Sequence, residues 1–361
     1  MAPSENSTAA FDPTNVNLET ADPRDVICAL AASEVEYNGQ LGARISSIFV
    51  ILVLSSAATF FPVAAKRLPR LRIPVYVYLF ARYFGAGVIV ATAFIHLLDP
   101  AYDAIGPHTC VAMTGAWGDY PWCAAIVLTS VTVIFLLDLA AERYVQMKYG
   151  IDTDQDLQAA VTNEGNPTRD SSTDETKTAA AYKEKFLEDS DSDSSARERS
   201  FRQQIAAFLI LEFGVIFHSV IIGLNLGVVG EEFSTLYVVL VFHQSFEGLG
   251  IGARMSAIPF RPGSWLPWIL CAAYGLTTPL AISIGLGVRN TYNSGSFTAS
   301  VISGVFDSMS AGILLYTGLV ELLARDFLFN PSRTNDNKRL LFMVGCVLLG
   351  AALMALLGKW A

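Results

Sequence analysis

Two stretches decide the fold of this chain: HSVIIGLNLG (218–227) and HQSFEGLGIG (243–252). Each lies inside an apolar segment that is long enough to cross a lipid bilayer, and each stretch begins with a histidine. His243 and Glu247 are four residues apart, so on a helix their side chains lie on one face, one turn apart. Ionisable side chains are costly inside a bilayer and mark functional sites there by default. The pattern therefore indicates a metal site within a membrane protein.

The composition is that of a membrane protein. Of the 361 residues, 52% are hydrophobic and 16% are charged, whereas a soluble domain has about 25% charged residues. A helix of about 20 apolar residues spans the hydrocarbon core. Eight such segments occur, at roughly 45–65, 75–98, 123–141, 205–229, 233–253, 265–288, 299–324 and 340–358. We therefore predict an all-α membrane protein, a bundle of eight transmembrane helices.

Basic residues give the predicted orientation. Lys and Arg are concentrated after the first, third, fifth and seventh segments, for example at Lys66, Arg143, Arg254 and Arg325. Because cytoplasmic loops are enriched in Lys and Arg, we place these ends in the cytosol. Both termini are then extracellular. Residues 1–43 contain no apolar region of the kind a cleaved signal peptide needs, so we expect the first span to act as the targeting signal.

Four regions follow from this topology. We expect residues 1–43 to form an acidic extracellular tail, residues 44–149 to hold the first three transmembrane helices, and residues 204–361 to hold the other five. Residues 150–203 are acidic and rich in serine, which is typical of a disordered cytoplasmic loop. Its DSDSDSS run (189–195) is either a site of regulatory phosphorylation or part of a passive linker.

The five cysteines contain no CxxC pair, which argues against a structural zinc module or a disulfide-built fold. Cys110 and Cys123 flank the connection between the second and third spans, on the predicted extracellular side. A disulfide between them is therefore a reasonable expectation. Cys28 shares that compartment and is an alternative partner. Cys271 and Cys346 fall inside spans, where a free cysteine behaves as a small apolar residue.

The fourth and fifth spans together offer two imidazoles and one carboxylate. Such a set leaves at least one coordination position for water or cargo, as an open zinc site does. The alternative is a pair of buried histidines bonded to carbonyls or to each other, but this leaves Glu247 in hydrocarbon unexplained. The predicted metal ligands are His218, His243 and Glu247, with Ser219, Asn225 and Gln244 as auxiliary residues along the metal path.

Other polar residues lie near the predicted ends of the spans. His96 and Asp99 are at the outer end of the second span, and Asp307 is at the outer end of the seventh. An acidic rim that carries a histidine attracts divalent cations, so we predict an entrance there. His96 as an interface residue and Asp307 as a helix cap are the alternatives. Glu321, nearer the cytoplasmic end of the seventh span, is a candidate for release or proton coupling.

The two quoted stretches resemble the signature pair of the ZIP (Zrt/Irt-like) metal transporters. ARYFGAGVIVATAFIHLLDPA (81–101) resembles the second span of the family's fungal plasma-membrane zinc importers, and DSMSAGILLYTGLVELL (307–323) resembles their seventh. The likeness covers essentially all eight spans. It implies a plasma-membrane importer of Zn²⁺, with Fe²⁺, Mn²⁺ and Cd²⁺ as further candidate substrates and no permanent cofactor. Relatives are thought to move by an elevator-like shift of one helix group against another.

The chain departs from the family at the second metal position. Members with a two-metal centre carry Glu four residues after the first histidine, where this chain has Ile222, and Asn and Asp where it has Ser219 and Gln244. We therefore expect one principal metal ion. Many relatives also have a histidine-rich sensing run, which is missing from residues 142–203. Candidate partners are the lipid bilayer, a second copy of the chain forming a homodimer, and kinase or ubiquitin machinery acting on the 150–203 loop; no basic patch supports nucleic-acid binding.

Two other classes of function fit the sequence less well. Two histidines and a glutamate can activate water in an intramembrane metallohydrolase, but the HExxH spacing of such enzymes is missing. In a receptor or a structural bundle, the ionisable side chains inside the predicted spans would have no function. We therefore predict a transporter and not an enzyme. Histidine ligands accept both Zn²⁺ and Fe²⁺, so the sequence leaves the choice between these ions open.

Overall fold

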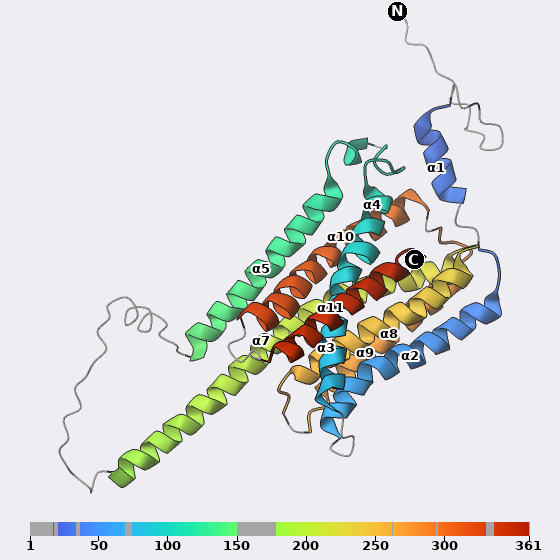
Figure 1. Cartoon of the computed structure of the whole chain (residues 1–361). Coiled ribbons are helices and arrows are strands. Elements are labelled where there is room, and N and C mark those ends of the chain that lie inside the picture. The colour runs from blue at the N-terminus through green and yellow to red at the C-terminus, as the bar shows by residue number, and fades with distance from the viewer. Residues whose placement is uncertain are drawn as a thin grey trace, which may run out of the picture.

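The computed structural model describes residues 17, 21–33, 37–68, 74–113, 115–149, 178–261, 263–293, 295–329 and 336–360. Within these residues every regular element is a helix (Figure 1). Eight helical segments are long and apolar enough to cross a membrane: 41–67, 75–105, 122–144, 204–228, 233–257, 266–288, 297–329 and 337–357. The predicted all-α membrane class and the predicted number of spans are confirmed.

The spans are built from one or more helical elements. Two π-helical segments, η1 and η3, continue α3 and α10 directly, and η2 is a single 3₁₀ turn. In chain order the elements are α1 (Pro23–Ser33), α2 (Leu41–Arg67), α3 (Val75–Ala91), η1 (Thr92–Leu98), α4 (Asp99–Ile105), η2 (Gly115–Trp117), α5 (Trp122–Tyr149), α7 (Thr178–Val228), α8 (Phe233–Ala257), α9 (Leu266–Val288), α10 (Phe297–Tyr316), η3 (Thr317–Phe329) and α11 (Asn337–Leu357).

Two regions that we expected to be irregular contain helix. Helix α7 begins at Thr178, so residues 178–203 of the predicted disordered loop are helical. Alanine has the highest helix propensity, and three alanines in a row at 179–181 start this helix. Helix α1 likewise lies within residues 1–43, for which we predicted only an acidic tail. The rest of that loop, residues 150–177, lies outside the described residues.

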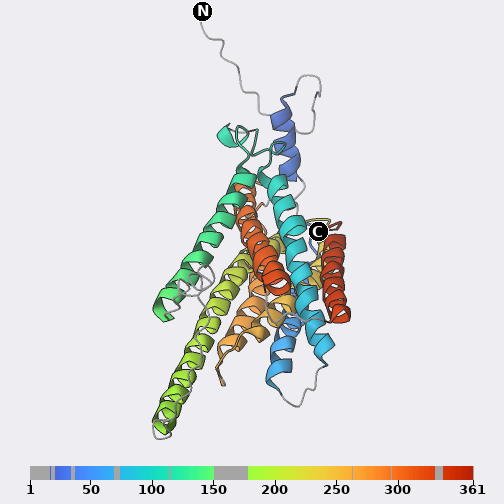
Figure 2. The same cartoon turned by 60° about the vertical axis from the view of Figure 1, so that its left-hand side comes forward.

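The spans form two groups (Figures 1 and 2). In one, which we call the α8 group, α2 packs against α8 and α9, and α9 packs against α7. In the other, which we call the α10 group, α10 packs against α4, η1 and α5, and α3 packs against α11. The two groups meet mainly where α3 crosses α8 and where α10 crosses α7.

Glycine allows the two groups to approach closely at one crossing. A Cβ atom added to Gly85 of α3 would collide with the backbone of Gly250 of α8, and a Cβ atom added to Gly250 would meet the backbone of Gly85. Small residues serve this purpose between membrane helices because dispersion contacts need short distances. This crossing therefore fixes how α3 lies against the helix that carries His243 and Glu247.

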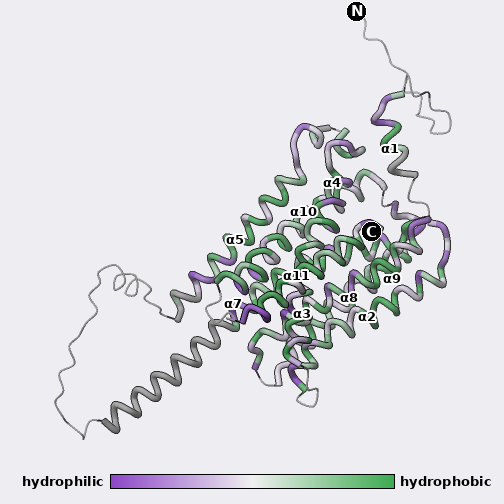
Figure 3. Tube along the Cα trace, viewed as in Figure 1, coloured by the Kyte–Doolittle hydropathy of each residue, from purple (hydrophilic) through white to green (hydrophobic). Residues whose placement is uncertain are grey.

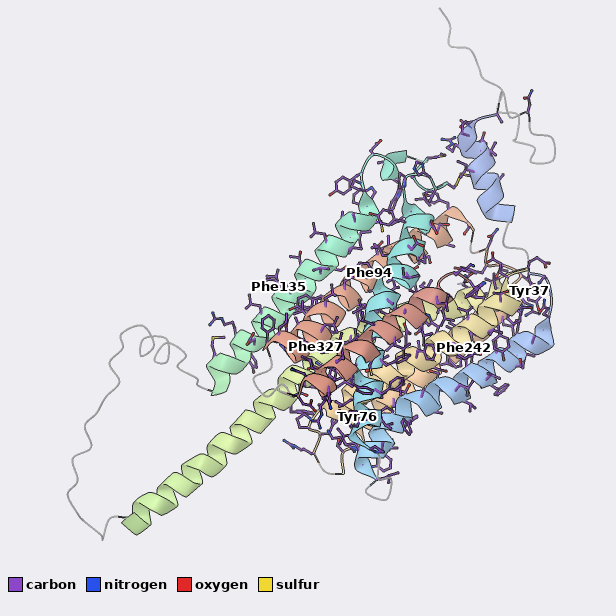
Figure 4. The ribbon with its side chains drawn as sticks, in the orientation of Figure 1. Tyr37, Tyr76, Phe94, Phe135, Phe242 and Phe327 are labelled. Atoms are coloured by element: carbon purple, nitrogen blue, oxygen red, sulfur yellow. A yellow bond between two sulfur atoms is a disulfide. The ribbon has the colours of Figure 1, made fainter. Side chains whose placement is uncertain are left out.

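The outer surface of the bundle suits contact with lipid. Apolar residues follow the helices through the body of the bundle (Figure 3). Phe94, Phe135 and Phe242, labelled in Figure 4, are 44%, 48% and 50% exposed. Large apolar side chains on the outside are favourable in a bilayer, where they meet acyl chains rather than water. The polar side chains discussed next lie in the interior of the bundle.

Candidate metal centre

The predicted ligands come from two helices of the α8 group. His218 lies in α7, and His243 and Glu247 lie one turn apart in α8. All three are buried, with exposed fractions of 3%, 0% and 1%. Since α8 presents residues i and i+4 on one face, the sequence spacing alone brings His243 and Glu247 together. The third residue, His218, joins them through the folding of α7 onto the same group.

The three side chains point toward one another. His218 Nε2 lies 3.3 Å from His243 Nε2, and His243 Nε2 lies 3.3 Å from Glu247 Oε1. One ligand atom from each residue falls within 4.8 Å of the others. Among the residues that the structure describes, no other group of three His, Cys, Asp or Glu side chains meets this condition. The arrangement can hold one small cation between two imidazoles and a carboxylate.

The surroundings of the buried Glu247 carboxylate also favour a bound cation. Neither of its oxygens has a hydrogen-bond partner, and His243 Nδ1 has none either. A buried carboxylate is normally hydrogen-bonded, because removing it from water without compensation is costly. A bound divalent ion would supply that compensation. The two histidine Nε2 atoms are within hydrogen-bond distance of each other, as in the alternative that pairs the histidines, but that pairing leaves the Glu247 oxygens without a hydrogen-bond partner.

The α10 group contributes His96 and Asp307 beside these ligands. The His96 ring packs edge-on against His243, with ring centroids 4.7 Å apart, and its Nε2 lies 3.0 Å from the carbonyl oxygen of Met354. Asp307 Oδ1 lies 3.9 Å from His218 Nδ1. Ser303 donates a hydrogen bond of 3.2 Å to the other Asp307 oxygen. These two residues flank the cluster from the opposite helix group.

Our prediction that these residues lie at the outer ends of their spans is therefore wrong. The second span continues through η1 into α4 and ends at Ile105, well beyond His96, and the seventh span begins at Phe297, more than two helical turns before Asp307. His96 and Asp307 consequently lie inside the membrane-length helices. Asp99, the third residue of the predicted entrance, is exposed and is not brought to the cluster. Apolar windows do not reveal a helix that continues through polar residues.

The auxiliary residues have different positions. Gln244 donates to Ser219 Oγ at 3.5 Å, and its Oε1 accepts a hydrogen bond of 3.0 Å from the Tyr274 hydroxyl. Tyr274 is fully buried in α9, and our sequence reasoning missed it, although a tyrosine within an apolar span needs a polar partner. Asn225 is half-buried, and its side chain forms no hydrogen bond to another described residue.

Glu321 is separate from the three predicted ligands. It is buried in η3, where its Oε2 lies 2.7 Å from Arg325 and 3.5 Å from Arg254 of α8. The Arg254 contact joins the α10 group to the α8 group. Arg82 of α3 makes a second ion pair nearby, at 2.6 Å from Asp326. The predicted exit residue is thus neutralised by arginines in this structure.

The predicted Cys110–Cys123 disulfide is wrong. Cys110 pairs with Cys28, with the two Cα atoms 4.8 Å apart. Cys123 is a free and buried thiol, packed with Ala101, Ile105 and Val111 and accepting a hydrogen bond of 3.3 Å from Ser308. Cys123 lies in the first turn of α5 and faces the core. Cys110 instead meets Cys28 of α1. Cys28 is the alternative disulfide partner that we considered from the sequence.

Comparison with known proteins places this geometry in a family. The family model described as ZIP Zinc transporter matches residues 41–358. The chain is 60% identical to zinc-regulated transporter 1 of Saccharomyces cerevisiae, with 97% of each chain covered. It is 38% identical to zinc-regulated transporter 1 of Schizosaccharomyces pombe, over 93% of this chain and 89% of that one, and 31% identical to zinc transporter 3 of Arabidopsis thaliana, over 91% and 88%. With eight spans around a buried His/His/Glu cluster and a match over nearly its whole length, the chain belongs to the ZIP zinc transporter family.

Proposed function

We propose that this protein imports Zn²⁺ into the cytosol and that the ion passes through a site made by His218, His243 and Glu247. The observation that carries the proposal is the convergence of two imidazoles and one carboxylate without a hydrogen-bond partner in the interior of eight membrane-length helices. Imidazole nitrogen and carboxylate oxygen are common zinc ligands. The relatives named as zinc transporters support the choice of this ion.

The same residues suit transport better than storage. Three protein ligands leave a coordination position open, through which water can enter and the ion can exchange. A conducting site has to bind strongly enough to replace hydration and weakly enough to release the ion. Imidazoles must be deprotonated to bind metal, so binding will weaken in acid. The site therefore binds the ion transiently during its passage across the bilayer.

We assign one principal ion to this centre. Ile222 supplies no ligand atom one turn after His218, and Gln244 is engaged with Tyr274 and Ser219. A second ion would have to displace these hydrogen bonds. Asn225 and Ser219 are left as polar residues along the path rather than as ligands of a second metal.

The two helix groups suggest how the ion moves. All three ligands belong to the α8 group, whereas His96 and Asp307 belong to the α10 group. We propose that the α8 group slides against the α10 group and carries the ion with it, in an elevator-like step. His96 and Asp307 then lie beside the ion from the α10 group at the start of this step.

Glu321 has a role at release under this proposal. The Arg254 side of its ion pair moves with α8, while Glu321 stays with η3, so sliding separates the two. Arg325 stays beside Glu321 on η3, so the carboxylate loses one of its two arginine partners and can then offer the departing ion a ligand. Glu321→Gln should slow the maximal uptake rate with little change in the zinc concentration at half-maximal rate. A large loss of zinc affinity instead would place Glu321 at entry or at the primary site.

We propose the plasma membrane as the location, with both termini outside and the 150–203 loop in the cytosol. The asymmetry of Lys and Arg supports this orientation. A cysteine introduced at Ser172 should resist an impermeant thiol reagent on intact cells and react after permeabilisation. Labelling on intact cells would reverse the orientation. A homodimer, and kinase or ubiquitin machinery acting on the loop, remain predictions about partners.

Uptake by the purified full-length protein tests the function. In liposomes that contain a zinc-sensitive dye, external Zn²⁺ should enter faster than in empty liposomes, and a fluorogenic peptide should not be cleaved. Competition by Fe²⁺, Mn²⁺ or Cd²⁺ during uptake of labelled zinc then ranks the other candidate substrates. Absence of zinc entry with correctly folded protein would contradict the proposal. Peptide cleavage in its place would favour the hydrolase.

A further inference from the structure

Two adjoining hollows lie at the end of the bundle opposite α1, one on each side of Lys66. The larger, about 550 Å³, lies between the end of α2 and the loop that joins α8 to α9, and its lining includes Lys66, Arg67 and Arg261. The smaller, about 330 Å³, lies between α2 and α3. Lys66 lines both hollows.

The larger hollow is suited to an anion. Its lining contains three basic side chains and, among the described residues, no carboxylate. Lys66 donates to the carbonyl oxygen of Ser256, and Arg67 donates to that of Ser264 at 2.8 Å. These carbonyls hold the cationic groups in place without neutralising them. A phosphate would supply a negative charge beside Lys66 and Arg67 and accept hydrogen bonds from them.

The smaller hollow is suited to a hydrocarbon chain. Apart from Lys66 and Tyr78, its lining is apolar, as with Phe61, Ala65 and Val77. Phe61 and Val77 are 44% and 41% exposed, on helices that span the membrane. An acyl chain of the surrounding bilayer can therefore reach the hollow without crossing water.

We propose that the two hollows bind one anionic phospholipid. Its phosphate lies against Lys66, Arg67 and Arg261, and one acyl chain lies between α2 and α3. Free phosphate uses only the basic hollow, whereas a phospholipid fills both, and this favours the lipid. The smaller hollow lies on the seam between the α8 group and the α10 group, since α2 belongs to one and α3 to the other. It is independent of the residues assigned to zinc.

Lipid titration of the purified full-length protein in detergent tests the site. Phosphatidylserine should bind with one tight equivalent per chain, detected by native mass spectrometry, and phosphatidylcholine of the same chain length should bind more weakly. Lys66→Gln and Arg67→Gln should each weaken phosphatidylserine binding about fivefold, the value expected for one cation near an anionic lipid. Lys338→Gln is the control, since this exposed lysine at the start of α11 lines neither hollow.

A second variant tests the acyl chain separately from the charge. Ala65→Leu fills part of the smaller hollow and leaves the basic residues unchanged, so it should weaken phosphatidylserine binding as well. Inorganic phosphate at matched concentration should compete poorly. The proposal is overturned if the two lipids bind equally, if Lys338→Gln has the same effect as Lys66→Gln, or if inorganic phosphate displaces the lipid at comparable concentration. Unchanged binding by Ala65→Leu would remove the acyl-chain part of the site.

Discussion

The α8 group and the α10 group differ in what they contribute to the centre of the bundle. The α8 group contains all three proposed ligands, held on α7 and α8 and supported by Tyr274 of α9 through Gln244. The α10 group contains only their neighbours, His96 and Asp307. Under the proposed elevator-like step, an ion would remain bound to the α8 group while the two groups change position. Substitutions in each group measure how unequally the two groups contribute to zinc uptake.

The largest effect is expected from the ligands of the α8 group. His218→Ala, His243→Ala and Glu247→Ala each remove one of only three donors. Removing a neighbour of a metal ligand typically costs about 10- to 100-fold, so loss of a ligand should reduce zinc uptake by more than about 100-fold. Initial uptake rates across zinc concentrations, normalised to surface protein, measure this. Ile222→Ala is the control and should have a mild effect, because Ile222 donates no ligand atom.

A smaller effect is expected on the α10 side. Asp307→Asn weakens the carboxylate that lies 3.9 Å from His218 Nδ1, so the zinc concentration at half-maximal uptake should rise by about tenfold, as for a residue that orients a ligand. Asp99→Asn makes the same chemical change at an exposed position and should leave uptake near that of the wild type. If Asp307→Asn were as severe as His218→Ala, both groups would hold the ion directly and the comparison would fail.

Contact between the groups can be tested without touching a polar residue. Gly85→Ala places a methyl group against Gly250, and overpacking of this kind costs about 1–3 kcal/mol. We expect a lower thermal unfolding midpoint and uptake reduced severalfold. Gly287→Ala provides the matched control in α9, since a Cβ atom there meets nothing within 4 Å. Equal behaviour of the two variants would show that the α3–α8 crossing is not tightly packed.

The smallest effect on uptake is expected outside the spans. Cys28→Ser and Cys110→Ser should each abolish the same disulfide and leave uptake nearly unchanged, because the bond joins α1 to a loop beyond the metal centre. Thiol alkylation followed by gel electrophoresis counts the free cysteines. Cys123→Ser should leave the disulfide intact. Loss of the disulfide in Cys123→Ser would restore the pairing that the sequence first suggested.

Hydrophobic patterning was sufficient to predict the transmembrane helices, because a helix that crosses a bilayer needs a minimum length and a high apolar content. It was also sufficient to bring His243 and Glu247 together, since their spacing is local to one helix. It failed for His96, because the helical continuation through η1 into α4 depends on packing between distant segments, and for Asp307, because its approach to His218 depends on how α10 packs against α7. Arg44 illustrates the same limit: it immediately precedes the first predicted span, yet it is fully buried and donates to the carbonyl oxygens of Leu226 and Gly227 at the end of α7.

X-ray absorption at the zinc edge of the purified protein, loaded with one equivalent of Zn²⁺, tests the proposed ligands most directly. The spectrum should contain imidazole scattering with zinc–nitrogen and zinc–oxygen distances of about 2.0–2.2 Å and no sulfur at about 2.3 Å. His243→Ala should lose one imidazole contribution, whereas His96→Ala should keep the wild-type coordination. A spectrum dominated by sulfur, or one that His243→Ala leaves unchanged, would contradict the assignment of the ion to the α8 group.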